Sequence, residues 1–107
     1  MFQVIKREGE VTDFTLTKIS DAIMKAFNAT DVQYNNDVVD LLALRVTADF
    51  QGKVKDDGIH VEDIQDSVEK VLEQAGYAEA AKAFILYRKQ REKMRTMTST
   101  ILDYKDV

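Results

Sequence analysis

The sequence predicts a single α+β domain in which an N-terminal β-hairpin lies over a bundle of four helices. Short β-prone runs flank a tight turn near the N-terminus, and four later segments carry apolar residues at helical spacing. The chain has 107 residues and no proline, so a length typical of one domain contains no residue that would interrupt a long helix. Because a hairpin alone is marginally stable in water, we expect the helices to support it.

The predicted hairpin occupies the first fourteen residues. Its turn is Glu8-Gly9, with glycine in the second place that tight two-residue turns favour. With this turn Lys6 faces Val11, and Val4, Lys6 and Val11 share one face. The adjacent cations Lys6 and Arg7 make the hairpin a candidate lid over an anion.

The first predicted helix follows the hairpin and can be capped by Thr17. Lys18 lies in its first turn, where the helix dipole disfavours a cation. Either Lys18 is simply solvated or it reaches an anion under the hairpin, and the pattern leaves both explanations open. The apolar stripe of this helix consists of Ile19, Ala22, Ile23, Ala26 and Phe27.

The second and third helices are predicted at about residues 37–51 and 62–74. Asn35 or Asn36 caps the second helix, and its wide apolar face predicts the most buried helix of the bundle. Gln65 lies on the edge of the third helix's stripe, as either a solvated residue or a polar contact beside a phosphate-binding N-terminus. The apolar face of the second helix comprises Val38, Leu41, Leu42, Val46 and Phe50, widened by Val39 and Ala43.

The fourth helix is predicted at residues 77–94, and Arg88 falls in line with its apolar stripe. A guanidinium there is costly unless it is paired or reaches solvent. Tyr87 and Arg91 lie one turn apart on the adjacent face. Arg88 therefore either pairs with carboxylates or joins a cluster that could neutralise a polyphosphate, consisting of Lys6, Arg7, Arg88 and Arg91.

Composition excludes several classes of function. The net charge of −4 argues against general binding to nucleic acid or anionic membranes. The absence of cysteine excludes disulfides, thiolate metal sites and a cysteine nucleophile, and it fits a cytoplasmic protein. The single histidine, His60, makes neither a triad nor a metal site, and we interpret it as structural or solvated. No phosphate-loop, dinucleotide or hydrolase motif is present.

The same residues resemble the ATP-cone domain family, and the resemblance covers about residues 1–93. It is greatest to the N-terminal cone of the anaerobic, glycyl-radical ribonucleoside-triphosphate reductases. In that comparison residues 101–104 lead towards a catalytic barrel, and we expect residues 94–107 to be a linker. The matching segments are Val4 to Gly9, Phe14, Lys18-Ile19, Ala22-Ile23, Ala26, Asp63 to Asp66, Val68-Glu69 and Ala81 to Arg88.

The resemblance implies allosteric control rather than catalysis by this chain alone. ATP would keep a reductase active and dATP would inhibit it through oligomerisation, with Mg²⁺ accompanying the nucleotide. The partners implied are the catalytic domain of the same polypeptide and, with dATP, further copies. Carried over residue by residue, the nucleotide-binding positions are Val4, Ile5, Lys6, Arg7, Lys18, Gln65, Tyr87, Arg88 and Arg91.

Two alternatives remain open at the level of sequence. One is a helical protein–protein interaction module without a ligand, whose cations only make surface salt bridges. The other is the cone of a nucleotide-responsive transcription repressor. That family carries a four-cysteine zinc ribbon before the cone, and the lack of cysteine here counts against it. An independent ATP hydrolase is least favoured, because no phosphate loop is present.

Overall fold

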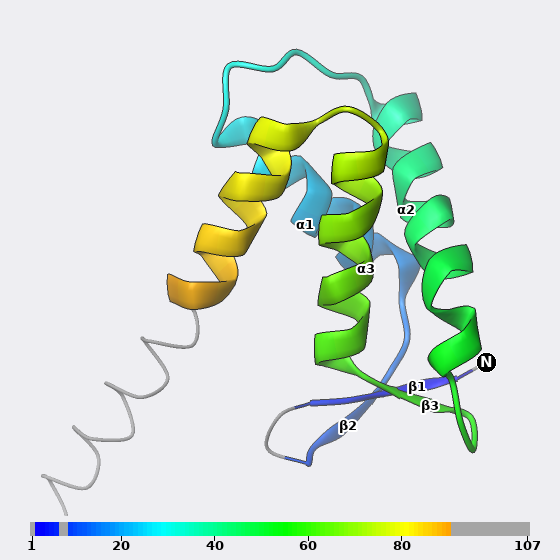
Figure 1. Cartoon of the computed structure of the whole chain (residues 1–107). Helices are drawn as coiled ribbons and strands as arrows, with labels where there is room; N and C mark the ends of the chain where they lie inside the picture. Colours follow the sequence, from blue (N-terminus) through cyan, green and yellow to red (C-terminus); the bar gives the residue numbers. More distant parts are fainter. Residues whose placement is uncertain (1, 7–8, 91–107) are drawn as a thin grey trace, which may run out of the picture.

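In a computed structural model of the chain, the domain consists of a helical bundle with a small sheet at one end (Figure 1). The model describes residues 2–6 and 9–90. The strands are β1 (Gln3–Ile5), β2 (Val11–Asp13) and β3 (Gly58–His60). The helices are α1 (Leu16–Asn28), α2 (Asn36–Phe50), the short 3-10 helix η1 (Gln51–Lys53), α3 (Val61–Gln74) and a fourth helix described over residues 78–90. The predicted α+β class with four α-helices is confirmed.

The sheet contains a third strand that the sequence did not predict. Its order is β2-β1-β3, with β1 antiparallel to β2 and parallel to β3. The amide of Gln3 donates to the carbonyl of Asp57 over 2.7 Å at the start of this parallel pair. β3 lies directly before the predicted third helix, in a segment for which no strand is predicted. Three residues are too few for alternation to reveal a strand.

A two-residue turn directly precedes β3. Lys55 and Gly58 exchange backbone hydrogen bonds of 2.9 Å in both directions. Between them Asp56 and Asp57 have φ values of 52° and 60°, the left-handed conformation that type I′ turns require and that aspartate tolerates better than most residues. This turn reverses the chain after η1 and aligns β3 beside β1.

The hairpin register differs by one residue from the prediction. Val4 pairs with Thr12 and Ile5 pairs with Val11, whereas the predicted turn placed Lys6 opposite Val11. The amide of Lys6 instead donates to the carbonyl of Glu10 over 2.7 Å, and Gly9 has a φ of 87°. The connection thus has three residues instead of two, with glycine at its left-handed position.

This shift exchanges side chains between the two faces of the sheet. Because paired residues share a face, Thr12 lies beside Val4 and Lys6, and Val11 lies with Ile5 on the opposite face. The predicted grouping of Val11 with Val4 and Lys6 is therefore wrong. The face that carries Val4 is directed towards the helices, whereas Val11 is 49% exposed.

An aromatic cluster joins the hairpin to the end of α2. The ring centroids of Phe2 and Phe14 lie 4.4 Å apart, and both rings contact Phe50 at 5.6 and 5.9 Å. Phe50 is fully buried. Such ring pairs contribute about 0.5–1.5 kcal/mol each beyond their burial, so the open end of the hairpin, opposite its turn, is held on the bundle.

The predicted helical stripes agree with the core, apart from one leucine. The stripes of α1 and α3 are buried or half-buried as expected. On α2, Val39, Leu42, Ala43, Val46 and Phe50 are buried, but Leu41 is 59% exposed. One side of α2 packs against α1 and α3, so the other side of its wide apolar face remains at the surface (Figure 1).

The helix ends show which capping predictions hold. α1 begins at Leu16 with Thr15 as its N-cap, so the prediction of Thr17 as the cap is wrong. The packing of Phe14 onto the core fixes the chain directly before this start. At α2 the Asn35 side chain accepts from the Val38 amide over 2.9 Å, which selects Asn35 over Asn36 as the cap.

The fourth helix begins at residue 78, after a glycine with a φ of 90° at position 76 ends α3. Its predicted end at residue 94 and the predicted linker at residues 94–107 lie outside the described residues. None of the helices in the described part of the chain combines the length and apolar character that crossing a membrane requires.

The two asparagines before α2 provide a matched test of the cap. We expect Asn35→Ala to lower the free energy of unfolding by about 0.5–2 kcal/mol, because an amide in the first turn loses its acceptor. Asn36→Ala, at an exposed helical position, should change it by less than about 0.5 kcal/mol. Urea denaturation of both variants measures the difference, and equal effects would contradict the assignment of Asn35 as the cap.

Candidate functional site

A cavity of about 190 Å³ lies between the inner face of the hairpin, α1, α3 and the fourth helix. Apolar side chains form most of its floor, and polar groups stand around them. This is the usual composition of a small-molecule site, although the volume is below the common range of about 300–1,000 Å³. Its lining residues are Val4, Lys6, Thr12, Asp13, Phe14, Thr15, Lys18, Ile19, Ala22, Val61, Ile64, Gln65, Val68, Phe84 and Tyr87.

Two lysines and a helix N-terminus give one side of the cavity a positive character. Lys6 extends from the hairpin, and Lys18 lies in the first turn of α1, which contains no acidic residue. Lys6 approaches the Glu10 carboxylate at 3.9 Å, but both side chains are substantially exposed, so this pair holds the ammonium group only weakly. The dipole of α1 adds to the attraction for an anion at this end, where the Lys18 amide donates to the Thr15 carbonyl over 3.2 Å.

The α3 N-terminus is less suitable for an anion. Glu62 and Asp63 occupy its first turn, where they already complement the helix dipole. The first turn of α1, which contains no acidic residue, is therefore the more favourable of the two helix ends for an anion.

Gln65 contributes an acceptor that has no donor. Its Oε1 atom is buried and makes no hydrogen bond among the described residues. A buried acceptor without a partner costs about 1–3 kcal/mol. Because Gln65 lines the cavity, a ligand that brings an N–H or O–H group would remove this cost.

Two aromatic residues of the fourth helix form the wall opposite the hairpin. Phe84 is buried, and its ring centroid lies 6.5 Å from that of Tyr87. The ammonium group of Lys25 on α1 lies 5.8 Å from the centre of the Tyr87 ring, within the range of a cation–π contact. These contacts hold the wall against α1.

Arg88 does not line the cavity but fastens its wall to α3. Its Nη1 atom donates to Glu69 over 2.6 Å and to Asp66 over 3.1 Å. The Arg88 side chain is only 16% exposed. Partial burial disfavours its charge, yet the hydrogen bonds from Arg88 to Glu69 and Asp66 outweigh this effect and raise the pKa of the guanidinium. The carboxylate pairing that the sequence left open is thus present.

The other predicted site residues are placed as follows. The structure brings Val4, Lys6, Lys18, Gln65 and Tyr87 together around the cavity. Ile5 lies on the opposite face of the sheet, because neighbouring residues of a strand alternate. Arg7 and Arg91 lie outside the described residues, so their predicted convergence on the cavity remains a prediction.

Sequence reasoning missed Thr12, Phe14 and Phe84 as lining residues. Thr12 was assigned to the wrong face by the one-residue error in register. Phe14 and Phe84 were recognised only as apolar positions. The spacing of Phe84 three residues before Tyr87 places both on neighbouring parts of one helix face, which is a signal that could have found it.

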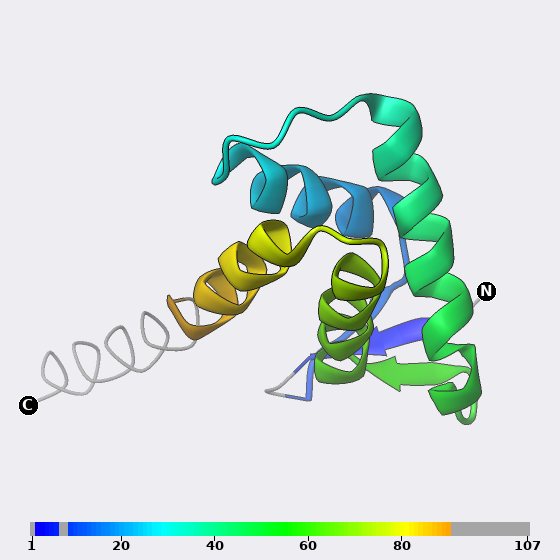
Figure 2. The ribbon, with the colours of Figure 1, turned by 45° about the horizontal axis from the view of Figure 1, so that its top comes forward.

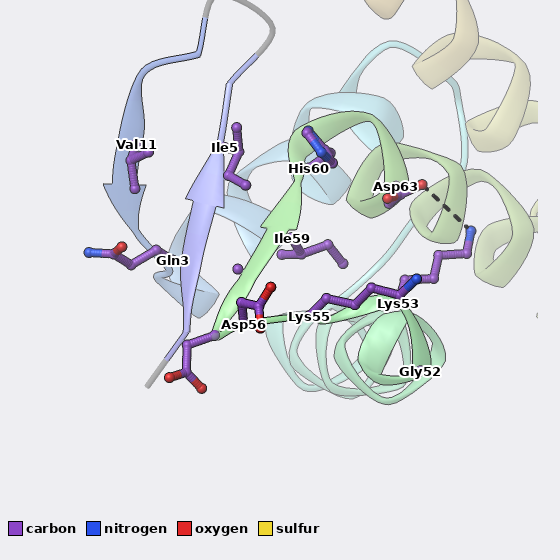
Figure 3. Close-up of a pocket in the computed structure, with 12 residues that line it drawn as sticks. Gln3, Ile5, Val11, Gly52, Lys53, Lys55, Asp56, Ile59, His60 and Asp63 are labelled. Atoms are coloured by element: carbon purple, nitrogen blue, oxygen red, sulfur yellow. Dashed lines mark ion pairs between the residues drawn. The ribbon is translucent and has the colours of Figure 1, made fainter.

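A second cavity of about 710 Å³ lies on the outer side of the sheet (Figure 3). The close-up shows Ile5 and His60 from neighbouring strands, with Lys53 paired to Asp63 at 3.9 Å. Its lysines are matched by aspartates of the β3 turn and α3, and none of its described lining atoms is a buried polar atom without a partner. The smaller inner cavity is therefore the better candidate site.

The chemistry of the inner cavity is that of binding. No group of three or more histidine, aspartate or glutamate side chains that could hold a metal ion occurs within residues 2–6 and 9–90. The cavity offers two lysines, one carboxylate on Asp13, one unpartnered acceptor and an apolar floor. This combination suits a ligand with an anionic end and an apolar, hydrogen-bonding body.

Comparisons with known proteins agree with this description. The model of the family described as "ATP cone domain" matches residues 2–93. The ribonucleoside-diphosphate reductase subunit alpha of Chlamydia pneumoniae is 39% identical over 86% of this chain and 9% of that protein. The vitamin B12-dependent ribonucleoside-diphosphate reductase of Mycobacterium tuberculosis is 34% identical, over 88% of this chain and 13% of that protein.

An anaerobic reductase is also similar. The anaerobic ribonucleoside-triphosphate reductase of Haemophilus influenzae is 31% identical over 94% of this chain and 14% of that protein. The chain thus spans between 9% and 14% of the length of these relatives.

The Arg88 contacts predict a structural effect that can be separated from binding. We expect Arg88→Ala to lower the free energy of unfolding by about 1–2 kcal/mol, because it leaves the half-buried Glu69 carboxylate without its charged donor. Lys89→Ala, at the neighbouring exposed position, should change it by less than about 0.5 kcal/mol. Chemical denaturation checks both values, and an unchanged stability for Arg88→Ala would contradict the role given to this arginine.

Proposed function

The chain belongs to the ATP-cone domain family, and we propose that it is the domain through which ATP and dATP control the activity of a ribonucleotide reductase. The observation that carries this proposal is the inner cavity, where Lys6 and Lys18 stand near the unpartnered acceptor of Gln65. The catalytic work would belong to another domain of the same polypeptide, as in relatives of which this chain matches only a small part.

The shape of the cavity supports a particular placement of the nucleotide. A volume of about 190 Å³ is too small for a complete nucleoside triphosphate by the usual range for ligand sites. We place the base and ribose on the apolar floor, with the phosphates extending past Lys6 and Lys18 over the N-terminus of α1. Mg²⁺ would accompany the phosphates.

Gln65 supports the nucleoside part of this proposal. Its buried Oε1 atom requires a donor. An adenine nucleotide offers donors in its exocyclic amino group and its ribose hydroxyls. dATP lacks one hydroxyl of ATP, so it offers fewer donors to the cavity while its charge is the same. The two effectors can therefore bind in different positions in the same site.

The hairpin supplies the element that could respond to the effector. It is held by the aromatic rings at its base, while the opposite end carries Lys6 beside the cavity. A useful allosteric coupling is about 1–3 kcal/mol, which a few altered contacts at the lid would provide. In the proposal ATP favours the active reductase and dATP the inactive one, through self-association.

The remaining predicted residues extend the proposed site. In the sequence Arg7 directly follows Lys6, and Arg91 follows Tyr87 by four residues. Both would add charge for the phosphates. Arg88 would act by holding Tyr87 and the wall in place through Glu69 and Asp66. Ile5 would support the lid from the outer face.

For the type of enzyme we propose the anaerobic ribonucleoside-triphosphate reductase. Its alignment reaches 94% of this chain, compared with 86% for the chlamydial diphosphate reductase, although the latter has the higher identity. The proposed location is the cytoplasm, where these nucleotides are made and used.

Calorimetric titration with ATP and dATP in the presence of magnesium tests the proposed site. We expect both to bind to the parent chain and Lys6→Ala or Lys18→Ala to weaken binding about tenfold or more, since each removes a charge-assisted contact to phosphate. Lys55→Ala is the matched control, because Lys55 lines the outer cavity on the other side of the sheet. It should bind like the parent.

Two results would contradict this proposal. The first is the absence of ATP and dATP binding to the folded parent chain, which would leave only an interaction module. The second is weaker binding by Lys55→Ala with unchanged binding by Lys6→Ala and Lys18→Ala, which would move the site to the outer cavity.

Gln65→Leu should change stability and affinity in opposite directions. Removing an acceptor that is buried without a donor should leave the empty protein as stable or more stable, with a melting temperature equal to or above that of the parent. The affinity for dATP should fall about tenfold, because the nucleotide loses its acceptor. Thermal unfolding and titration of the same sample measure both, and unchanged affinity would exclude Gln65 from the site.

A further inference from the structure

Two patches of exposed leucine remain outside the proposed nucleotide site. Leu41 and Leu44 on α2 are 59% and 56% exposed, and Leu86 on the fourth helix is 59% exposed. Leu41 and Leu44 are three residues apart and so lie on the same face of α2. Single exposed leucines are ordinary, so the argument depends on what surrounds each of them.

Leu44 borders a groove of about 650 Å³ between α1 and α2. Its walls include the apolar side chains of Leu16, Met24 and Val39. Asp21 on α1 and Asp40 on α2 contribute carboxylates, and no cation is among the described residues that line it. A segment that fills this acidic groove must combine apolar and basic side chains.

The fourth helix presents such a ridge. Lys82 precedes Leu86 by four residues and Lys89 follows it by three, so all three side chains share one exposed face. Lys82 approaches Glu79 at 3.9 Å, but both side chains are more than 70% exposed, so the pair is weak and screened. Both lysines therefore remain available to carboxylates of another molecule.

The groove and the ridge lie on opposite sides of the domain. α2 and the fourth helix stand at the two flanks of the molecule in both ribbon views (Figure 2). One molecule therefore cannot place its own ridge in its own groove. We propose that the occupant of the α1–α2 groove is the Lys82–Leu86–Lys89 ridge of a second copy of this chain.

The contact joins two different surfaces. A molecule whose ridge is bound still has an unoccupied groove, and a molecule whose groove is bound still has an unoccupied ridge. Such a head-to-tail contact builds rings or open chains instead of closed dimers. None of the groove or ridge residues lines the nucleotide cavity. The inference therefore deepens the self-association in the proposed function by naming its two surfaces, and it can be tested separately from nucleotide binding.

Sedimentation velocity of the 107-residue chain at increasing concentration tests this contact. We expect the average mass to rise past that of a dimer and the association to weaken in 1 M sodium chloride, where charges are screened beyond about 3 Å. A groove variant, Asp40→Lys with Leu44→Ser, and a ridge variant, Lys82→Ser with Leu86→Ser, should each associate about tenfold or more weakly. Val11→Ser, at an equally exposed apolar residue away from both surfaces, is the control and should associate like the parent.

Mixing the two variants distinguishes this contact from a symmetric one. The groove variant retains its ridge and the ridge variant retains its groove, so an equimolar mixture should form dimers and nothing larger. Circular dichroism and dATP titration of each variant establish that it is folded.

Three outcomes would overturn the proposal: a parent that stays monomeric up to millimolar concentration, a variant that associates like the parent, or a mixture that stays monomeric. If dATP does not bind while the mixture dimerises, the proposed function fails and this contact stands.

Discussion

The pairing of β1 with both of its neighbours is the constraint on which the candidate site depends. A slip of one residue in a strand moves every side chain to the other face. The observed register directs Val4 and Lys6 towards the helices, and β3 fixes β1 from the side opposite β2. The contact of Phe2 and Phe14 with Phe50 then anchors the sheet on α2. The position of the lid over α1 and α3 follows from these contacts.

The groups around the cavity are paired with one another, whereas the cavity itself contains a polar atom without a partner. Arg88 bridges two carboxylates of α3, and the rings of Phe27 and Tyr77 meet at 5.0 Å near the start of the fourth helix. The cavity itself keeps an acceptor on Gln65 without a donor. A buried polar atom without a partner calls for an explanation, and a ligand that supplies the missing donor is one such explanation.

Helical periodicity predicted the fold class, the four helices and most of the core, because burying one face of each helix leaves a repeated signal along the chain. Leu41 was wrongly predicted to be buried because α2 is apolar on both sides. The third strand and the hairpin register could not be predicted in the same way. A three-residue strand carries no period, and a glycine in this turn fits a two-residue and a three-residue connection alike, so the sequence did not decide between them.

Nuclear magnetic resonance of the labelled chain during titration with dATP and magnesium tests the central claim, that the nucleotide binds between the inner face of the hairpin and the helices. The account predicts that the largest shifts in the described part of the chain occur at Val4, Lys6, Lys18, Gln65 and Tyr87. Shifts concentrated instead around Ile5, Val11, Lys55 and His60 would place the ligand on the outer side of the sheet and contradict it.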